Sequence, residues 1–305
     1  MPRIRTSVVC GVALVAAMCA AGATPAAVEQ PRARRHPTTV RSVSQRDGSL
    51  CKTDQQAVAA GIGGVHPTGP AARKAPSPTA GKSLVFDEEF TGPITFGSRW
   101  NGSTTSAYKY GNHNPGDDKL DWLTPSAITA SGGTVTFTAK PGSNILENGK
   151  RSWDTGLLTT EGTTENFQAR TGDYAEVRVQ LPGAQGAWPA MWTWIDGDDE
   201  VDVFEYHPDK NELEVVNHVN YAYTFYTDPA TIFPGAWIAV GAHYGATNDD
   251  WYLNGDLIYS DHTGVGSTWQ ANIVLNLSIN AGFYHPAPSS NTPITFNANY
   301  VCVWR

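Results

Sequence analysis

The chain has 305 residues, of which 40% are hydrophobic, 16% charged and 10% aromatic. This composition excludes a disordered chain, and neither a collagen-like nor a coiled-coil period is present. All 32 aromatic residues lie after position 82, so a hydrophobic core of real size can form only within about 83–305.

The charge divides at the same place. Residues 1–82 hold 11 Lys and Arg against 3 Asp and Glu, a formal charge of +8, whereas 83–305 hold 10 against 26, a charge of −16. An acidic globular part argues against nucleic acid and anionic membranes as partners, because phosphates need a basic face. It suits a neutral substrate, although acidity also serves solubility alone.

The N-terminus has the three parts of a secretory signal. Arg3 and Arg5 precede a small and apolar run over 7–21, and Ala21-Gly22-Ala23 offers a cleavage site. The run is shorter than the roughly 20 residues that span a bilayer. We therefore predict a signal peptide over 1–23 and a secreted protein with no membrane contact after its removal. The alternative is a lipid anchor on Cys19, which the preceding Met18 disfavours.

Residues 24–82 are rich in Pro, Ala, Arg, Ser and Thr, which predicts a disordered linker or pro-segment. Removal of the signal leaves two cysteines, Cys51 and Cys302. An oxidising compartment permits a disulfide between them, but nothing in the sequence fixes their distance, so paired and free thiols both stay open.

Short runs rich in Val, Thr, Tyr, Trp and Phe follow, separated by Gly, Pro, Asn and Asp. We expect strands at Thr134–Thr138, Tyr174–Leu181, Glu200–Tyr206, Leu213–Tyr221, Trp237–Ala242, Asn272–Ile279 and Tyr300–Trp304. Asn254-Gly255 between two further runs predicts a hairpin. The fold expected for 83–305 is one all-β domain, an antiparallel β-sandwich of the jelly-roll kind.

The segment that holds the most chemistry is an acidic strand at 199–206. Strand side chains alternate, so Glu200 and Asp202 share a face, and regular alternation would put Glu205 on the other. A one-residue bulge after Asp202 would return Glu205 to the shared face, with Val201 and Val203 behind it. Three carboxylates would then line one concave surface.

Carboxylates in a row repel one another, and enzymes use such crowding to keep one carboxyl ionised and another protonated. A retaining glycosidase needs two carboxyls about 5–5.5 Å apart, one as nucleophile and one as acid/base. Glu200 and Glu205 suit these roles if both lean towards a substrate, and Asp202 between them can share a proton with the nucleophile.

Two other readings of the acidic strand are a solvated face and a calcium loop. A loop built on Asp196, Asp198 and Asp199 fails the helix–loop–helix calcium spacing. A solvated face is at odds with Trp188 and Trp192, which lie within one short loop of the carboxylates. Indole faces stack on sugar rings and indole N–H groups bond hydroxyls, although Trp also packs ordinary cores.

Several motifs in this order resemble glycoside hydrolase family 16 over about 84–305. They are Glu200-x-Asp202-x-x-Glu205, Trp188-Pro-Ala-x-Trp192 and the stretch Tyr174–Pro182, with weaker echoes at Phe86–Phe90, Arg99-Trp100 and Asn299–Trp304. The spacing before Glu205 resembles the bulged, laminarinase-like branch, which includes enzymes on β-1,3-glucans.

The resemblance implies a concanavalin A-like jelly roll that cuts internal β-glycosidic bonds with retention. By match, Glu200 is the nucleophile, Asp202 its assistant and Glu205 the acid/base. The positions that match sugar subsites are Trp188, Trp192 and His218, although a histidine such as His218 is as readily a bonded core residue.

The resemblance implies no catalytic cofactor or metal. Asn299 stands where many family members have an Asp that helps to bind a structural calcium, which makes calcium doubtful here. The leading hypothesis is therefore a secreted, monomeric endo-glycosidase whose partner is a polysaccharide, in first place a β-1,3-glucan. The alternatives are a non-catalytic carbohydrate-binding module of the same fold and a transglycosylase.

Overall fold

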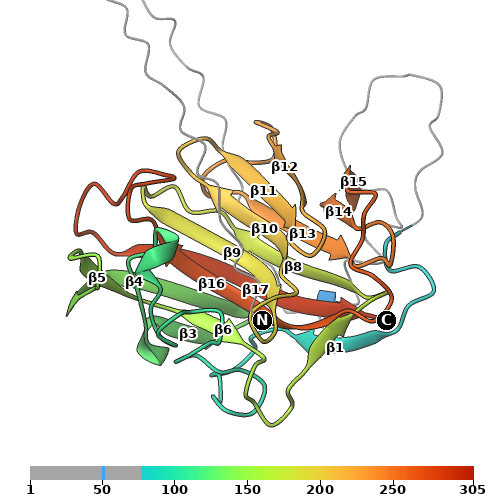
Figure 1. Cartoon of the computed structure of the whole chain (residues 1–305), viewed down its shortest axis with the longest axis horizontal. Coiled ribbons are helices and arrows are strands. Elements are labelled where there is room, and N and C mark those ends of the chain that lie inside the picture. Colours follow the sequence, from blue (N-terminus) through green and yellow to red (C-terminus); the bar gives the residue numbers. More distant parts are fainter. Residues whose placement is uncertain (1–49, 52–76) are drawn as a thin grey trace, which may run out of the picture. The chain divides into compact units, whose positions relative to one another are not determined.

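Two β-sheets lie face to face and enclose most of the apolar side chains between them (Figure 1). The computed structural model describes residues 50–51 and 77–305. Nearly all strand pairs in this part are antiparallel, and only β2 and β5 run parallel. The predicted jelly-roll sandwich is confirmed.

The larger sheet has the strand order β15-β14-β13-β8-β17-β4-β5-β2, with β1 paired to β17 and β3 to β4. Its strands are β1 (Leu84–Glu88), β2 (Asp121–Leu123), β3 (Ile128–Ser131), β4 (Thr134–Ile145), β5 (Arg151–Thr155), β8 (Tyr174–Gln180), β13 (Trp237–His243), β14 (Asp250–Leu253), β15 (Asp256–Ser260) and β17 (Ile294–Trp304).

The smaller sheet has the order β12-β11-β10-β9-β16-β6, with β7 paired to β16. Its strands are β6 (Leu157–Thr159), β7 (Gln168–Arg170), β9 (Ala187–Trp194), β10 (Val201–His207), β11 (Glu212–Asn217), β12 (Ala222–Tyr226) and β16 (Gln270–Ile279). Two single-turn 3-10 helices, η1 (Pro115–Asp117) and η2 (Pro125–Ala127), lie in the loops.

The alternation of the sequence explains which faces meet. In β8, Ala175, Val177 and Val179 are buried, whereas Glu176 and Arg178 between them are partly exposed. This period of two places one apolar face of each sheet against the other, and burial of apolar surface between the sheets stabilises the sandwich.

The Asn254-Gly255 turn joins β14 to β15 as predicted. Both turn residues have positive φ, 51° for Asn254 and 84° for Gly255, which is the geometry of the turns that match strand twist. One strand prediction was wrong in its end: the run Leu213–Tyr221 is strand only to Asn217 and then turns. Asn217 fixes this turn, because its amide donates to Asp249, Asp261 and the Gly264 carbonyl.

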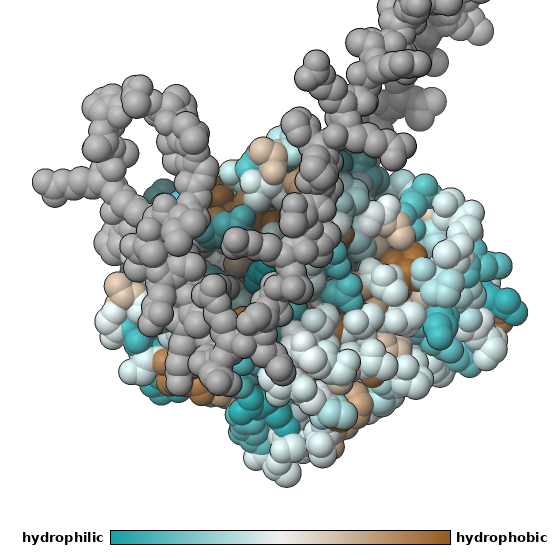
Figure 2. Space-filling model, turned by 180° about the vertical axis from the view of Figure 1, so that it is seen from behind, coloured by the Kyte–Doolittle hydropathy of each residue, from teal (hydrophilic) through white to brown (hydrophobic). Residues whose placement is uncertain are grey.

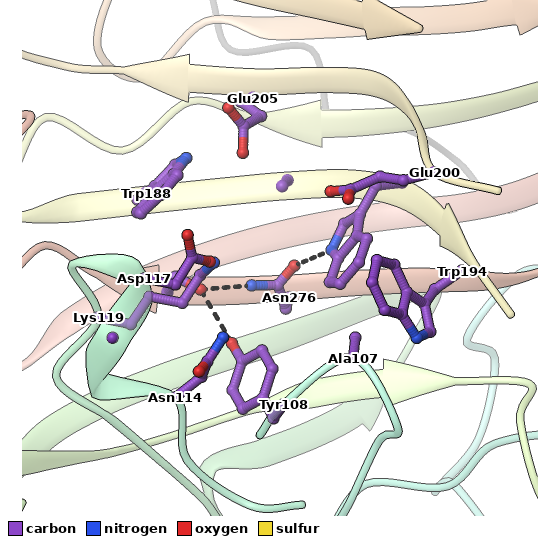
Figure 3. A pocket seen from close by; sticks show the side chains of 14 residues that line it. Ala107, Tyr108, Asn114, Asp117, Lys119, Trp188, Trp194, Glu200, Glu205 and Asn276 are labelled. Carbon is purple, nitrogen blue, oxygen red and sulfur yellow. Dashed lines mark hydrogen bonds and ion pairs between the residues drawn. The ribbon is translucent and has the colours of Figure 1, made fainter. Parts of the chain in front are cut away.

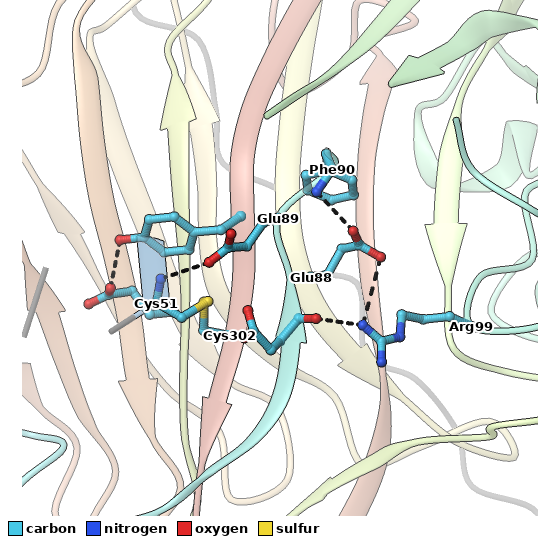
Figure 4. Close-up of a disulfide and its surroundings, with 9 residues drawn as sticks. Cys51, Glu88, Glu89, Phe90, Arg99 and Cys302 are labelled. Atoms are coloured by element: carbon cyan, nitrogen blue, oxygen red, sulfur yellow. Dashed lines mark hydrogen bonds and ion pairs between the residues drawn. A yellow bond between two sulfur atoms is a disulfide. The ribbon is translucent and has the colours of Figure 1, made fainter. Parts of the chain in front are cut away.

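The predicted signal peptide and most of 24–82 lie outside the described residues. Within the part that is described, Cys51 and Cys302 form a disulfide with Cα atoms 6.1 Å apart (Figure 4). Of the two states that the sequence left open, the paired one is therefore present. Cys51 is buried, and its N–H donates to the Glu89 carboxylate at 3.3 Å.

The face in Figure 2 is mostly hydrophilic or neutral, with small separate apolar patches where its described residues are visible. Among the described residues, no helix is both long and apolar enough to cross a membrane.

Candidate active site

Strand β10 contains the bulge that the sequence predicts. Asp202 lies opposite Trp192 of β9, and Glu205 lies opposite Ala190, only two positions further along β9. The register of β10 against β11 shifts over the same interval. Because three positions of β10 match two of β9, Glu205 returns to the face of Asp202.

The apolar residues of β10 hold the bulge in place. Val201, Phe204 and Val203, which is the extra residue relative to β9, are fully buried in the core. A bulge leaves ladder groups without their usual partners. Here the indole N–H of Trp251, on the opposite sheet, donates to the Asp202 carbonyl oxygen at 2.8 Å.

A cavity of about 360 Å³ lies over this face of the smaller sheet, and Glu200 and Glu205 both point into it (Figure 3). Its lining comes from β9, β10, β16 and the loop before β2. The lining residues are Ala107, Tyr108, Asn114, Gly116, Asp117, Lys119, Trp188, Ala190, Trp192, Trp194, Glu200, Glu205, Asn276 and Ser278.

Glu200, Asp202 and His218 form the first charged group of the cavity. Their nearest polar atoms all lie within 4.8 Å of one another, and His218 Nε2 is 3.1 Å from Asp202 Oδ2. This contact raises the pKa of His218 to about 9, so the imidazole is cationic at neutral pH. Burial and the neighbouring Asp202 raise the pKa of Glu200 to about 8, and the His218 cation acts in the opposite direction.

Glu205 has a different set of neighbours. Burial, followed by the charges of Asp202 and Glu214, raises the pKa of Glu205 well above its usual range, and the Lys119 cation opposes them. Glu214 lies directly opposite on β11, and its Oε2 is 3.1 Å from His207 Nε2. Burial and two neighbouring carboxylates thus disfavour the negative charge on Glu205, whereas the His218 cation favours the negative charge on Glu200.

The tryptophans of β9 form one wall of the cavity. Trp188 and Trp192 line it as the sequence predicts, and Trp194 joins them. The indole N–H of Trp192 donates to Asn276 at 2.8 Å, whereas those of Trp188 and Trp194 have no hydrogen-bond partner among the described residues. Both of these indole nitrogens are buried, so it is the rings of Trp188 and Trp194 that face the cavity.

The structure thus brings all six predicted site residues to one face: Glu200, Asp202, Glu205, Trp188, Trp192 and His218. His218 is 40% exposed at its side chain and bonded to Asp202, so the interpretation as a buried core histidine is wrong.

Other cavity residues were not singled out from the sequence. Lys119 pairs with Asp117, and its ammonium lies 4.6 Å from the Trp188 ring centre. The Tyr108 hydroxyl donates to the buried Asp121 at 2.6 Å. These side chains come from a loop region without a regular alternation of apolar and polar residues. No sequence signal therefore places them at the cavity.

The calcium position implied by the resemblance is taken by direct hydrogen bonds. Asn299 donates from its amide nitrogen to the Gly133 carbonyl at 2.9 Å and to Thr134 Oγ1 at 3.0 Å. Its amide oxygen accepts from the Arg178 guanidinium. A cation does not fit there, because the ligand oxygens are already bonded and a positive charge adjoins them.

No family model matches the sequence. The chain is 36% identical over 121 residues to the endo-1,3-1,4-beta-glycanase EglC of Rhizobium meliloti, an alignment that covers 34% of this chain and 25% of that protein. The chain therefore spans only about a quarter of that relative.

Solved structures match over more of the chain. The endo-beta-1,3-glucanase of Pyrococcus furiosus aligns with a TM-score of 0.62 and 20% identity, over 73% of this chain and 94% of that one. SCLam, a non-specific endo-beta-1,3(4)-glucanase from family GH16, aligns with a TM-score of 0.58 and 19% identity, over 74% and 92%. Together with the sequence relative, they confirm the resemblance of this chain to the laminarinase-like branch of glycoside hydrolase family 16.

Proposed function

We propose that the chain is a secreted endo-acting hydrolase that cleaves β-1,3-glucan with retention of anomeric configuration. The observation that carries the proposal is the bulge in β10, which brings Glu200 and Glu205 to one cavity beside the tryptophans of β9. A non-catalytic sugar-binding module has no need for two carboxyls held together at the cost of their repulsion.

The first step uses Glu205 as the acid and Glu200 as the nucleophile. Glu205 gives its proton to the glycosidic oxygen as the bond to the anomeric carbon breaks. The Glu200 carboxylate attacks that carbon and forms a covalent glycosyl ester. The raised pKa of Glu205 keeps the proton available at neutral pH.

The second step reverses the roles. The Glu205 carboxylate takes a proton from a water molecule, whose oxygen attacks the anomeric carbon and releases Glu200. Asp202 lies beside Glu200 and is bonded to the His218 cation, so it can share the proton of Glu200 and then leave that carboxylate ionised for the next cycle.

The tryptophan wall supplies binding. The rings of Trp188 and Trp194 line the cavity and cover the apolar faces of the sugars. The curated relative is named for bonds of both 1,3 and 1,4 type, and the Pyrococcus structure for 1,3 bonds. We place β-1,3-glucan first because the spacing before Glu205 resembles the bulged, laminarinase-like branch of the family.

Export is part of the proposal. The Cys51–Cys302 disulfide supports it, since such bonds persist in oxidising compartments. We propose that the secreted protein acts as a monomer, which light scattering of the purified protein would test.

The test is release of reducing sugar from laminarin, lichenan, agarose, xyloglucan and galactan by the wild type and by Glu200→Gln and Glu205→Gln. Glu165→Gln, a change at an exposed residue paired only with Arg99, is the matched control. We expect laminarin hydrolysis in the wild type and the control, and its loss in both site variants. Proton NMR of the first product should show the β-anomer.

Full activity of Glu200→Gln would refute the mechanism. Release from another polymer alone would keep the mechanism and change the substrate. Binding without any release would favour the carbohydrate-binding module, and lengthened products would indicate transglycosylation.

A further inference from the structure

An edge strand of the smaller sheet carries three exposed aromatic side chains in a row. Tyr221, Tyr223 and Phe225 have exposed fractions of 72%, 49% and 47%. Tyr223 and Phe225 occupy alternate positions of β12, so their side chains lie on one side of the strand. Tyr221 lies in the turn just before β12, with its ring 5.8 Å from that of Tyr223. We call these three residues the aromatic strip.

The strip lies on the same face of the sheet as the catalytic carboxylates. Tyr223 is opposite Val216 of β11, which is opposite Asp202. Phe225 is opposite Glu214, which is opposite Glu205. Residues directly opposite one another in an antiparallel pair share a face, so the strip lies two strands from the carboxylates, roughly 10 Å away.

Ring contacts connect the strip to the cavity without a break. The His218 ring, which bonds Asp202, lies 6.5 Å from the ring of Tyr221. The rings of Tyr221 and Tyr223 are 5.8 Å apart, and those of Tyr223 and Phe225 are 5.9 Å apart. The strip is therefore a continuation of the site and not a separate patch.

The fold does not need these rings. The core side of β12 is made by Ala222, Thr224 and Tyr226, and Tyr226 packs against the hydrophobic core. Exposed aromatics on an edge strand invite unwanted pairing. Tyr221 also has a φ of 51°, a conformation that costs a bulky side chain free energy and that Gly or Asn would adopt with less strain.

We propose that the aromatic strip binds further sugar units of the same polysaccharide chain, on the side of the cleaved bond away from the tryptophans. This inference rests on the proposed function. The strand order β12-β11-β10-β9 places the strip and the tryptophan wall on opposite sides of Glu200 and Glu205. A polysaccharide that lies across the sheet from β9 to β12 covers about 14 Å, which is enough for several sugar units.

The position of the strip favours a polysaccharide over a second copy of this protein as the occupant. A second copy seated on the strip would cover the concave face beside the cavity and hinder access of a polymer to it. Aromatic rings with one polar edge, such as those of Tyr221 and Tyr223, match the mixed apolar and hydroxyl surface of a neutral sugar. The strip thus favours long neutral chains over short fragments.

The test compares a long and a short substrate. The variant is the double change Tyr223→Ala with Phe225→Ala, and the matched control is Phe233→Ala, a ring 46% exposed in a loop before β13. Initial rates are measured on laminarin and on laminaritriose, and retardation is measured in native gels that contain laminarin. Light scattering gives the size of each protein, and the conservative variant Phe225→Tyr gives rescue.

In the double variant, the KM for laminarin is expected to rise on the order of tenfold, with kcat little changed. Its kcat/KM on laminaritriose should change less than about twofold, since that substrate occupies few units beyond the cleaved bond. Phe233→Ala and Phe225→Tyr should behave as the wild type. An unchanged KM for laminarin, an equal loss on both substrates, or a wild-type dimer that the double variant splits would overturn the proposal.

The gel separates this proposal from the proposed function. If the wild type hydrolyses no polymer but is retarded by laminarin, and the double variant is not retarded, the strip proposal stands and the hydrolase proposal fails. If hydrolysis is lost in Glu200→Gln but is unchanged in the double variant, the hydrolase proposal stands and the strip proposal fails. If the wild type shows neither hydrolysis nor retardation, both fail.

Discussion

Replacing Glu214 by Gln removes the negative charge that faces Glu205 from the neighbouring strand. The two carboxylates lie opposite each other in the sheet, and their nearest oxygens are within 4.8 Å. Glu214 is one of the groups that raise the pKa of Glu205, together with burial and Asp202. Because Glu205 must be protonated to act as the acid, loss of Glu214 should remove the acid form at a lower pH.

The size of this shift follows from the separation of the charges. At 4.8 Å, two unit charges repel by about 3.5 kcal/mol at an effective dielectric constant of 20 and by about 0.9 kcal/mol in bulk water. One pKa unit is about 1.36 kcal/mol, so the pKa of Glu205 should fall by between about 0.6 and 2.5 units.

The assay is kcat/KM for the best glucan across the pH range, for the wild type, Glu214→Gln and the charge-keeping Glu214→Asp. The alkaline limb of the Glu214→Gln profile should move to lower pH by the amount above, and Glu214→Asp should move much less. An alkaline limb that stays in place, or that moves to higher pH, would refute the assignment of the proton to Glu205. A uniform loss at every pH would show that Glu214 acts only on the structure.

Three further predictions follow from contacts described above. His218→Asn removes a cation that lowers the pKa of Glu200, so the acid limb of the profile should move to higher pH; an unmoved limb would contradict the pairing. Cys51→Ser opens a ring closed over 251 positions and should lower the free energy of unfolding by about 2–5 kcal/mol in guanidinium titrations, whereas an unchanged midpoint would show that the bond adds no stability. A chelator should leave the melting temperature unchanged, because Asn299 bonds Gly133 directly; a rise of several degrees on adding calcium would show that a cation binds.

The two-residue alternation of apolar and polar side chains in the sequence predicts both the fold and the three carboxylates of the site, for one physical reason. Side chains of a strand alternate, so Glu205 can share a face with Glu200 and Asp202 only if the strand has a bulge, and the structure has that bulge. The other strands of the sandwich alternate in the same way, and each strand run expected from the sequence contains strand residues.

What the sequence leaves open depends on contacts between distant segments. Lys119 and Tyr108 reach the cavity from irregular loops, and Glu214 meets Glu205 only through the register of β10 and β11. The turn after Asn217 depends on Asp249 and Asp261, more than thirty residues away along the chain. Such pairings are fixed by packing, and no local pattern carries them.

The disulfide between Cys51 and Cys302 has a consequence for maturation. It ties a residue of the 24–82 segment to the last strand of the sandwich, so the two ends of the described chain form one covalent loop. A protease that cuts within 52–76 yields two polypeptides that remain joined, and they separate on a gel only after reduction. A shortened protein that begins at residue 83 would instead keep Cys302 as an unpaired thiol. A shortened protein that is to keep this disulfide must therefore begin before Cys51.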